Sequence, residues 1–470
     1  MKKSVFLCGA LLLALPGLAT ATDYPLTFKA LDAQQALTFP SGTTTYAMIQ
    51  PAKPAGIVKA PPAVSRYPLY GQIPAGGDQL LFRLDESKGT GQGYDRLIVD
   101  VNRNGDLTDD PVVSVVPPAN RGGAVIGQQQ MLFGPIQGPD NLKIGSDRPI
   151  FFAQVFLFIT GQSVANMGPG STAGEILVKT GWYLQATVDV DGKQHKVGLV
   201  DANCNFRLGD LEKAVFPRVV PTFGAAANDA QTSWSFQGGD RFLVDWDGAS
   251  SVQNSILGDQ SSPFGPLLYF GAKPYKVALS ADCKTLSLEP WAEPMAELGL
   301  QPRGDFIGAL QVGWEKTPGE WVLLQPGVEN GKAKVPPGNY RLYSVGLKAK
   351  TSSGDSLILS GTKRMADAAI KAVAGESTPL KCGAPLKLGL TATASGSAAV
   401  SSSGSILSSI LGQSGPTQTI QATILGAGGE TYSTPYLLSD RGALRQPQSP
   451  AYTVLTADGK PVDSGSLEYG

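Results

Sequence analysis

Oxygen-bearing side chains crowd one short stretch of this chain, "DVNRNGDLTDD", which runs from Asp100 to Asp110. Carboxylates and amides are the side-chain ligands that calcium prefers in proteins. In a tight loop around a cation, residues one, three and five turn inward, and here these are Asp100, Asn102 and Asn104. The spacing therefore predicts a calcium loop whose intervening side chains point away from the ion.

The second half of this first loop (Asp100–Asp110) would supply the remaining ligands. Calcium takes six or seven oxygens at roughly 2.3 to 2.6 Å, so we expect a backbone carbonyl near Asp106 and a carboxylate from Asp109 or Asp110. Gly105 suits the sharp turn that such a loop makes at its sixth position. A bare turn rich in Asn, Asp and Gly is the alternative. Four carboxylates this close would repel one another without a cation, which favours the ion.

The same pattern returns about one hundred residues later in "GLVDANCNFRLGDL", which starts at Gly198. The matching oxygen donors of this second loop are Asp201, Asn203, Asn205 and Asp210. An apolar strand precedes both loops, so the chain contains a weak internal repeat, either two halves of one β domain or two related β units. Phe206 replaces the glycine and fewer residues are charged, so we expect weaker calcium binding here, with a plain turn as an equal alternative.

The first loop resembles the calcium loops of EF-hand proteins, dockerins and thrombospondin repeats. It departs from them at its twelfth position, where Pro111 stands in place of a bidentate glutamate. Its flanks also read as strands instead of helices. The resemblance therefore implies calcium binding by alternating oxygens, without a helix-loop-helix hand.

Short runs of β-branched and aromatic residues recur along the chain, separated by clusters of Gly, Pro, Asn and Asp. This pattern predicts an all-β protein with two domains of β-sandwich type. We expect an N-terminal β domain over residues 22–290 that carries both loops, a boundary between Pro290 and Gly304, and a C-terminal β-sandwich over residues 304–470. Within the latter, Trp321 to Leu347 resembles prealbumin-like sandwiches of exported bacterial proteins, which implies a non-catalytic accessory module.

The start of the chain has the pattern of a secretory signal peptide. Lys2 and Lys3 precede an apolar run, and a small-residue cleavage motif ends at Ala21. Residues 1–21 are therefore predicted to be a signal peptide, and the protein is expected to be exported to the periplasm or the extracellular space. The whole chain resembles uncharacterised secreted bacterial proteins with EF-hand-like loops. Three cysteines follow the predicted cleavage site, so at most one disulfide can form among Cys204, Cys283 and Cys382.

Composition excludes some classes of partner. The chain of 470 residues has 16% charged residues and a net charge of −1, so it lacks the basic excess that nucleic-acid binding needs. After the signal peptide, the most apolar stretch, from Pro149 to Thr160, is too short for a spanning helix and reads as a buried strand, so we expect no transmembrane segment in the mature chain. The partner expected for such a surface protein is a polysaccharide or another cell-surface protein.

Catalytic residues are not evident from the sequence. No nucleophile elbow of the form G-x-S-x-G is present, and His195, the one histidine, is expected to lie in solvent at the start of a strand. Glycoside hydrolysis needs only two carboxylates, and Glu289 and Glu293 flank Trp291. The same cluster also reads as a polar linker. The leading interpretation is therefore a calcium-binding protein with a structural or ligand-binding role, and the alternative is a carbohydrate-active enzyme.

Overall fold

The computed structural model describes residues 20–466, apart from 40–44, 76–77, 91–92, 118–128, 140–143, 145, 159–161, 169, 212, 220–231, 238, 247–259, 302–305, 351–353, 364–367, 396–416, 433–434, 440–443, 450 and 456–457. The described part of the chain is built almost entirely from antiparallel strands, so the predicted all-β class is confirmed. Its strands form facing pairs of sheets around separate apolar cores, which we call the first, second and third sandwiches.

The first sandwich packs two four-stranded sheets against each other. One has the order β3-β10-β9-β8 and the other β4-β5-β6-β7. Alternate residues of strands such as β10 are buried, as expected where one face of a strand meets a core. The core draws its aromatic and aliphatic side chains from both sheets. The strands are β3 (Thr45–Ile49), β4 (Leu69–Ala75), β5 (Asp78–Glu86), β6 (Tyr94–Val99), β7 (Val112–Ser114), β8 (Gln129–Gln137), β9 (Ile150–Leu157) and β10 (Gly174–Thr180).

The second sandwich combines the sheet β16-β15-β12-β11-β2 with the sheet β1-β19-β18-β17. Its core is centred on Trp182, which stacks on Phe28 at a ring distance of 5.7 Å. The strands are β1 (Thr22–Pro25), β2 (Thr27–Ala30), β11 (Trp182–Val190), β12 (Lys193–Val200), β15 (Arg241–Val244), β16 (Ser261–Pro263), β17 (Leu267–Phe270), β18 (Lys273–Leu279) and β19 (Thr285–Pro290).

The third sandwich packs a long sheet on the short sheet β23-β24-β20-β28. The long sheet begins with β14-β13-β22-β21-β25-β26, so two strands from the first half of the chain pair with the third sandwich. The strands are β13 (Lys213–Val219), β14 (Thr232–Gln237), β20 (Ala296–Gln301), β21 (Phe306–Thr317), β22 (Glu320–Leu324), β23 (Val328–Glu329), β24 (Lys332–Val335), β25 (Gly338–Lys350), β26 (Ser356–Thr362), β27 (Ile370–Ala372), β28 (Ser377–Lys381), β29 (Lys387–Ser395), β30 (Thr417–Leu425), β31 (Thr431–Tyr432), β32 (Tyr436–Leu438) and β33 (Leu444–Arg445).

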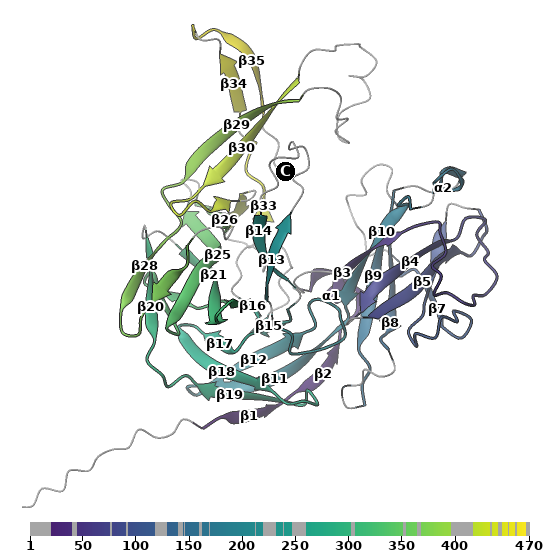
Figure 1. The fold of residues 1–470 in the computed structure, drawn as a ribbon, viewed down its shortest axis with the longest axis horizontal. Coiled ribbons are helices and arrows are strands. Elements are labelled where there is room, and N and C mark those ends of the chain that lie inside the picture. The colour runs from purple at the N-terminus through teal and green to yellow at the C-terminus, as the bar shows by residue number, and fades with distance from the viewer. Residues whose placement is uncertain are drawn as a thin grey trace, which may run out of the picture.

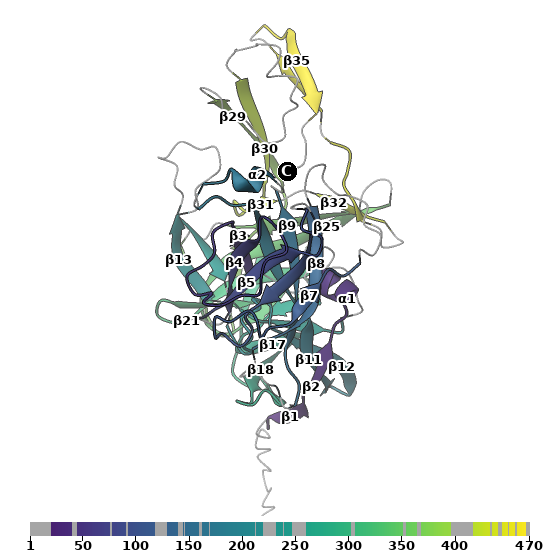
Figure 2. The same ribbon diagram turned by 90° about the vertical axis from the view of Figure 1, so that its right-hand side faces the viewer.

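The sandwiches follow one another along a curve, as Figure 1 shows, with the first at the right, the second at the bottom and the third at the left. The hairpin of β34 (Ala451–Leu455) and β35 (Pro461–Ser466) extends from the third sandwich beyond β29 and β30, which is also clear in the turned view of Figure 2. In the part of the chain that the structure describes, the helices are α1 (Ala33–Thr38), whose N-cap is Asp32, and α2 (Gln162–Ala165). Within the described residues, no helix has the length and apolarity to cross a membrane.

The structure divides the chain into more parts than the two domains that the sequence predicts. The described residues within 22–290 contain the cores of two sandwiches instead of one, together with two smaller apolar clusters. The expected boundary between Pro290 and Gly304 contains β20, whose leucines belong to the third core. Residues 1–19 of the predicted signal peptide lie outside the described part of the chain.

Candidate functional site

The first loop connects β6 to β7 and is fastened to the segment before β4. Val58 and Lys59 both donate their N–H groups to the carbonyl of Gly105, and Leu107 donates to the carbonyl of Lys59. Leu107 is buried with Ile57 and other apolar residues in a small core. The loop is thus anchored on both sides before any ligand is considered.

Within the first loop, side-chain oxygens bind the backbone in a regular pattern. Asp100 accepts the N–H of Asn104 at 3.1 Å on one carboxylate oxygen and that of Gly105 at 2.8 Å on the other. Asn102 Oδ1 accepts the N–H of Asn104 at 3.1 Å, and Asn104 Oδ1 accepts that of Asp106 at 2.6 Å. Both amide nitrogens donate to the same oxygen, Oδ2 of Asp109, at 3.3 and 2.8 Å. The structure therefore brings together the alternating residues and Asp109.

Asp110 also turns toward the loop. Its Oδ1 accepts the N–H of Val101 at 3.2 Å. Its Oδ2 is closed off from solvent and has no hydrogen-bond partner. The pKa of this carboxyl is raised to about 7, chiefly by burial and also by the charges of Asp100, Asp109 and Asp106, while the hydrogen bond from the Val101 N–H lowers it. If Asp110 is ionised, no hydrogen bond from the protein compensates the charge on its Oδ2 atom.

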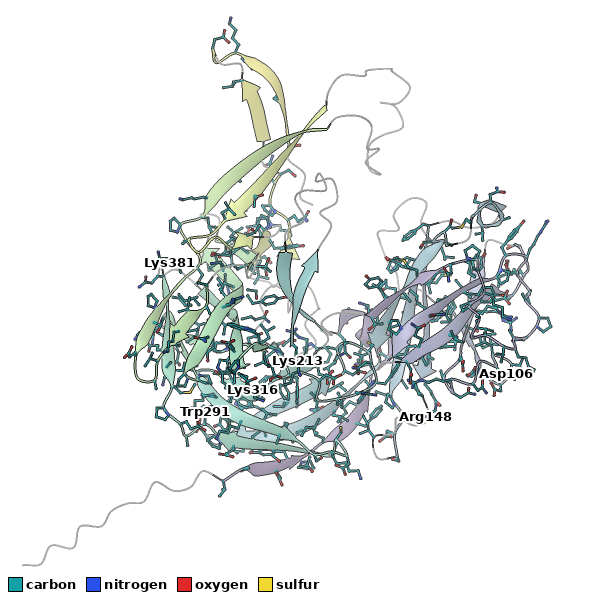
Figure 3. The ribbon with its side chains drawn as sticks, viewed as in Figure 1. Asp106, Arg148, Lys213, Trp291, Lys316 and Lys381 are labelled. Carbon is teal, nitrogen blue, oxygen red and sulfur yellow. The ribbon has the colours of Figure 1, made fainter. Side chains whose placement is uncertain are left out.

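The Asp106 carboxylate already has partners in the protein. It accepts hydrogen bonds from Thr108 and pairs with Lys59 at 2.9 Å. The Thr108 hydroxyl and the Lys59 ammonium lower the pKa of Asp106 to about 2. Figure 3 shows Asp106 near the outer end of the first sandwich. The backbone carbonyl oxygen of Asp106 is therefore the group of this residue that remains to bind an ion.

The second loop follows β12 and repeats the pattern of the first. Asp201 accepts the N–H groups of Asn205 and Phe206 at 3.1 and 2.8 Å. Asn203 Oδ1 accepts the N–H of Asn205, and Asn205 Oδ1 that of Arg207. The amide nitrogen of Asn205 donates to Oδ2 of Asp210, as Asn104 does to Asp109. The predicted repeat thus extends to equivalent hydrogen bonds.

The backbone conformation of the two loops also agrees. Arg103 and Gly105 have φ of 62° and 77°, and the matching Cys204 and Phe206 have φ of 52° and 64°. Left-handed conformations are uncommon for residues other than glycine and are strained for a bulky one. Phe206 therefore adopts the loop conformation despite the substitution, held by packing against Phe151 at a ring distance of 5.3 Å.

The second loop touches two sandwiches. β12 belongs to a sheet of the second, whereas Cys204 and Phe206 are buried in the core of the first. Thr45, at the start of β3, donates its hydroxyl to the carbonyl of Asn203. The Cys204 thiol lies 3.6 Å from the carbonyl oxygen of Val178 in β10. The loop therefore lies at the junction of the first and second sandwiches.

Asp240 is a residue of the second loop's surroundings that the sequence pattern did not indicate. It precedes β15 and is fully buried. Its Oδ2 accepts the N–H groups of Gly209 and Asp210 at 2.7 and 3.0 Å, and its own N–H donates to the carbonyl of Asp210. Its Oδ1 is buried without a partner. Only the fold brings this residue, thirty positions downstream of Asp210, to the loop.

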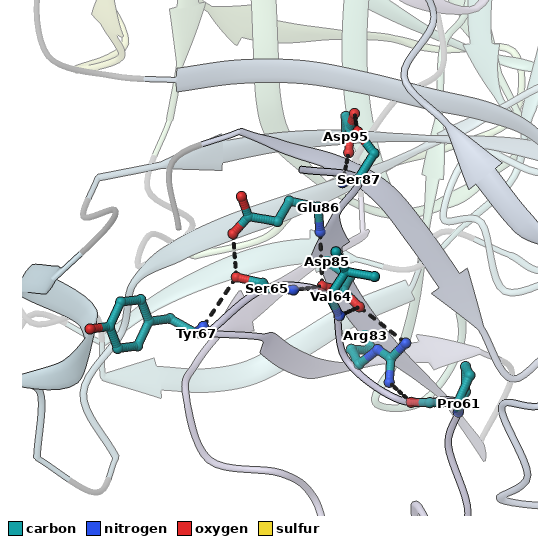
Figure 4. Close-up of polar contacts among 9 residues, drawn as sticks. All are labelled: Pro61, Val64, Ser65, Tyr67, Arg83, Asp85, Glu86, Ser87 and Asp95. Carbon is teal, nitrogen blue, oxygen red and sulfur yellow. Dashed lines mark hydrogen bonds and ion pairs between the residues drawn. The ribbon is translucent and has the colours of Figure 1, made fainter. Parts of the chain in front are cut away.

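In the described part of the chain, buried carboxylate oxygens without a hydrogen-bond partner occur at Asp110 in the first loop and at Asp240 beside the second. Five of the buried acidic side chains in the described part of the chain have hydrogen bonds on both oxygens: Asp85, Glu86, Asp100, Asp201 and Glu430. Figure 4 shows the first two, where Asp85 binds Arg83 and the N–H groups of Val64 and Ser65. The remaining buried acids are Asp110 and Asp240, and each has one oxygen without a partner.

Other ligand types contribute little. Among the described residues, no group of three or more His, Cys, Asp or Glu side chains is gathered so that it could hold a metal ion. Any site at the loops must therefore also use amide and backbone oxygens. Cys204, Cys283 and Cys382 are free thiols, and Cys204 and Cys382 are buried.

His195 is more enclosed than expected. Its side chain is 12% exposed, and its Nδ1 lies 2.7 Å from Asp245 Oδ2, so the prediction of a solvated strand-end histidine was wrong. The pair lines a cavity of about 530 Å³ where the second and third sandwiches meet. Glu289 and Glu293 both pair with Lys276, which lies over the ring of Trp291. This arrangement is a surface ion cluster and not a pair of opposed catalytic carboxyls.

Comparisons with protein-family models, with curated proteins and with solved structures found no significant match to this chain.

Proposed function

We propose that this chain is an exported calcium-binding protein, in which calcium in the first loop stabilises the β fold. Its place would be the periplasm or the cell surface, and its role structural or ligand-binding toward a polysaccharide or another surface protein. Export rests on the charged and apolar N-terminal pattern. The calcium assignment rests on the chemistry of the loop.

One observation carries the calcium assignment: the Asp110 oxygen that is buried without a partner. An unpaired buried acceptor is costly, and more so when it is charged. Asp110 lies in electrostatic range of three further carboxylates. A divalent cation at this place would satisfy the free oxygen and remove the repulsion in one step.

The amides are compatible with this proposal. Asn102 Oδ1 and Asn104 Oδ1 each accept one backbone hydrogen bond. A carbonyl oxygen has two lone pairs, so each keeps one for an ion. Asp109, which now receives both amide nitrogens, is the carboxylate that a cation would attract into the same shell. Extracellular calcium modules bind with Kd of about 10⁻⁴ to 10⁻³ M, which is the range we expect.

A calorimetric titration of chelator-treated protein with calcium chloride tests the assignment. We expect saturable binding to the wild-type chain. Asp110→Asn keeps an acceptor for Val101 and the shape of the side chain but removes the charge, so it should abolish or strongly weaken binding at the first loop. The matched control is Asp282→Asn, which changes an exposed carboxylate between β18 and β19 and should leave the titration unchanged. Equal binding by Asp110→Asn and wild type would contradict the proposal.

The alternative of a glycoside hydrolase gains no specific support from the described residues. The acidic pair beside an aromatic residue that the sequence suggested, Glu289 and Glu293, forms ion pairs with Lys276. A general acid would need a raised pKa in a cleft that also holds the second carboxylate. We therefore keep the structural or ligand-binding role as the conclusion.

A further inference from the structure

The second loop lacks a carboxylate that the first loop has. The position of Asp110 corresponds to Leu211, so the loop itself offers only Asp201 and Asp210 as charged ligands. This deficit was the reason to expect weak binding. In the folded protein, Asp240 lies beside the same end of the loop.

Asp240 is held firmly in this place. One carboxylate oxygen accepts two backbone N–H groups from the loop, and the backbone of Asp240 donates back to Asp210. Its carbonyl accepts the N–H of Phe264, which joins it to the next strand. The second carboxylate oxygen is buried and has no partner. Fully buried, unpartnered acceptors in native proteins call for an unseen water, ion or ligand.

Charge identifies the missing partner as a cation. The Asp240 carboxyl is in electrostatic range of Asp201 and Asp210. Asp201 and Asp240 are buried and Asp210 is partly exposed. Among the described residues no three acidic side chains are gathered closely enough to hold an ion by themselves, so the asparagine amides and backbone carbonyls would supply part of the shell. Such a mixed set of oxygen donors suits calcium, which accepts six to eight oxygens in flexible geometry. Magnesium fits less well because it keeps several of its own waters.

We propose that Asp240 completes a second calcium site with Asp201, Asn203, Asn205 and Asp210, and that this site locks the first sandwich to the second. The inference rests on the proposed function, because it assigns the same ion to the second loop. Asp240 and β12 belong to the second sandwich, whereas Cys204 and Phe206 in the loop are buried in the first core. An ion here would therefore join groups from both sandwiches.

Counting bound calcium by equilibrium dialysis of the full chain tests the site. We expect two ions for the wild type, one for Asp240→Asn and one for Asp110→Asn. The amide in Asp240→Asn still accepts the loop N–H groups, so the fold should persist, as a melt in chelator would check. If the wild type binds no calcium, the proposed function fails together with this inference. If Asp240→Asn binds as many ions as the wild type, only the inference about Asp240 is overturned.

Cys204 reports on the junction itself. Its thiol is buried in the core of the first sandwich, on the loop that comes from the second, so it should react with iodoacetamide only when the junction opens. Calcium should slow its alkylation in the wild type by about tenfold or more, and should have little effect in Asp240→Asn. Cys382, buried in the third core, is the internal control and should react equally slowly in all conditions. The same Cys204 rate with calcium and with chelator would overturn the locking role.

Discussion

Gly105 illustrates how one residue adapts the first loop to its neighbours. Its φ is +77°, and a Cβ added there would stand 2.5 Å from the carbonyl oxygen of Gly56. Two separate constraints therefore act at this position, the left-handed backbone and the close approach of another segment. Phe206 meets the first constraint in the second loop with a large side chain, because that loop directs the side chain into a core.

Substitution at Gly105 should separate these two constraints. Gly105→Ala adds both left-handed strain and a clash with backbone, whereas Gly192→Ala adds only the strain, since nothing lies within 4 Å of the new Cβ. We expect Gly105→Ala to lower the free energy of unfolding by about 1 to 3 kcal/mol more than Gly192→Ala does. Urea denaturation of both variants measures the difference. Equal losses would show that Gly56 can move aside at no cost.

The Asp240 carboxyl predicts a pH dependence of the calcium-free protein. Burial and, after it, the Asp201 charge raise its pKa from 3.8 to about 9. Between these values the folded state holds a proton that the unfolded chain has released, so the free energy of unfolding should fall as pH rises. Asp240→Asn carries no such proton and should reduce this slope. Urea denaturation in chelator at pH 5, 7 and 8.5 measures it, and an unchanged slope in the variant would contradict the assignment.

At the scale of elements, buried hydrogen bonds and ion pairs hold irregular segments onto strands. Asp85 in β5 accepts the N–H groups of Val64 and Ser65 and pairs with Arg83 (Figure 4). The side chains of Ser65, Arg83 and Asp85 are buried. The arrangement fixes the segment before β4 on the sheet that carries the first loop. It resembles the loops in using carboxylates to bind backbone, but it leaves no carboxylate oxygen free.

Removing the Asp85 carboxylate should lower the free energy of unfolding far more than removing an exposed ion pair of the same loop region. Asp85→Ala leaves Arg83 buried without its charge partner, for which a loss of about 3 to 5 kcal/mol is expected. Asp78→Ala removes the pair with Arg103, where the Asp78 side chain is 64% exposed, and should cost less than about 1 kcal/mol. Chemical denaturation distinguishes the two, and comparable losses would contradict the structural role of the buried pair.

The sequence predicted local features better than distant ones. The alternating oxygens, the turn at Gly105 and the strands before each loop depend on neighbouring residues, and the structure contains these turns and strands. Asp240 could not be predicted because the pairing of β12 with β15 brings it to the loop. The separate cores of residues 22–290 were also missed, because strand alternation reveals a buried face without revealing which sheet covers it.

At the scale of the whole molecule, the positions of the two loops determine which parts of the fold a bound cation would stabilise. The first loop belongs to the first sandwich, and the second loop connects the first sandwich to the second. Phe206 packs on Phe151 at this junction, and α1 lies in a small core with Phe152 of the first sandwich and Leu243 of the second. A cation that binds only the folded loops would stabilise the fold by mass action.

A thermal melt of the full chain, in about 1 mM calcium and in excess chelator, tests the account most directly. For a site with Kd of about 10⁻⁴ M, calcium at this concentration adds about 1.4 kcal/mol to the free energy of unfolding. We expect the midpoint to be higher by about 3 to 6 °C per site with calcium, and not with magnesium. A midpoint that does not move between calcium and chelator would contradict it.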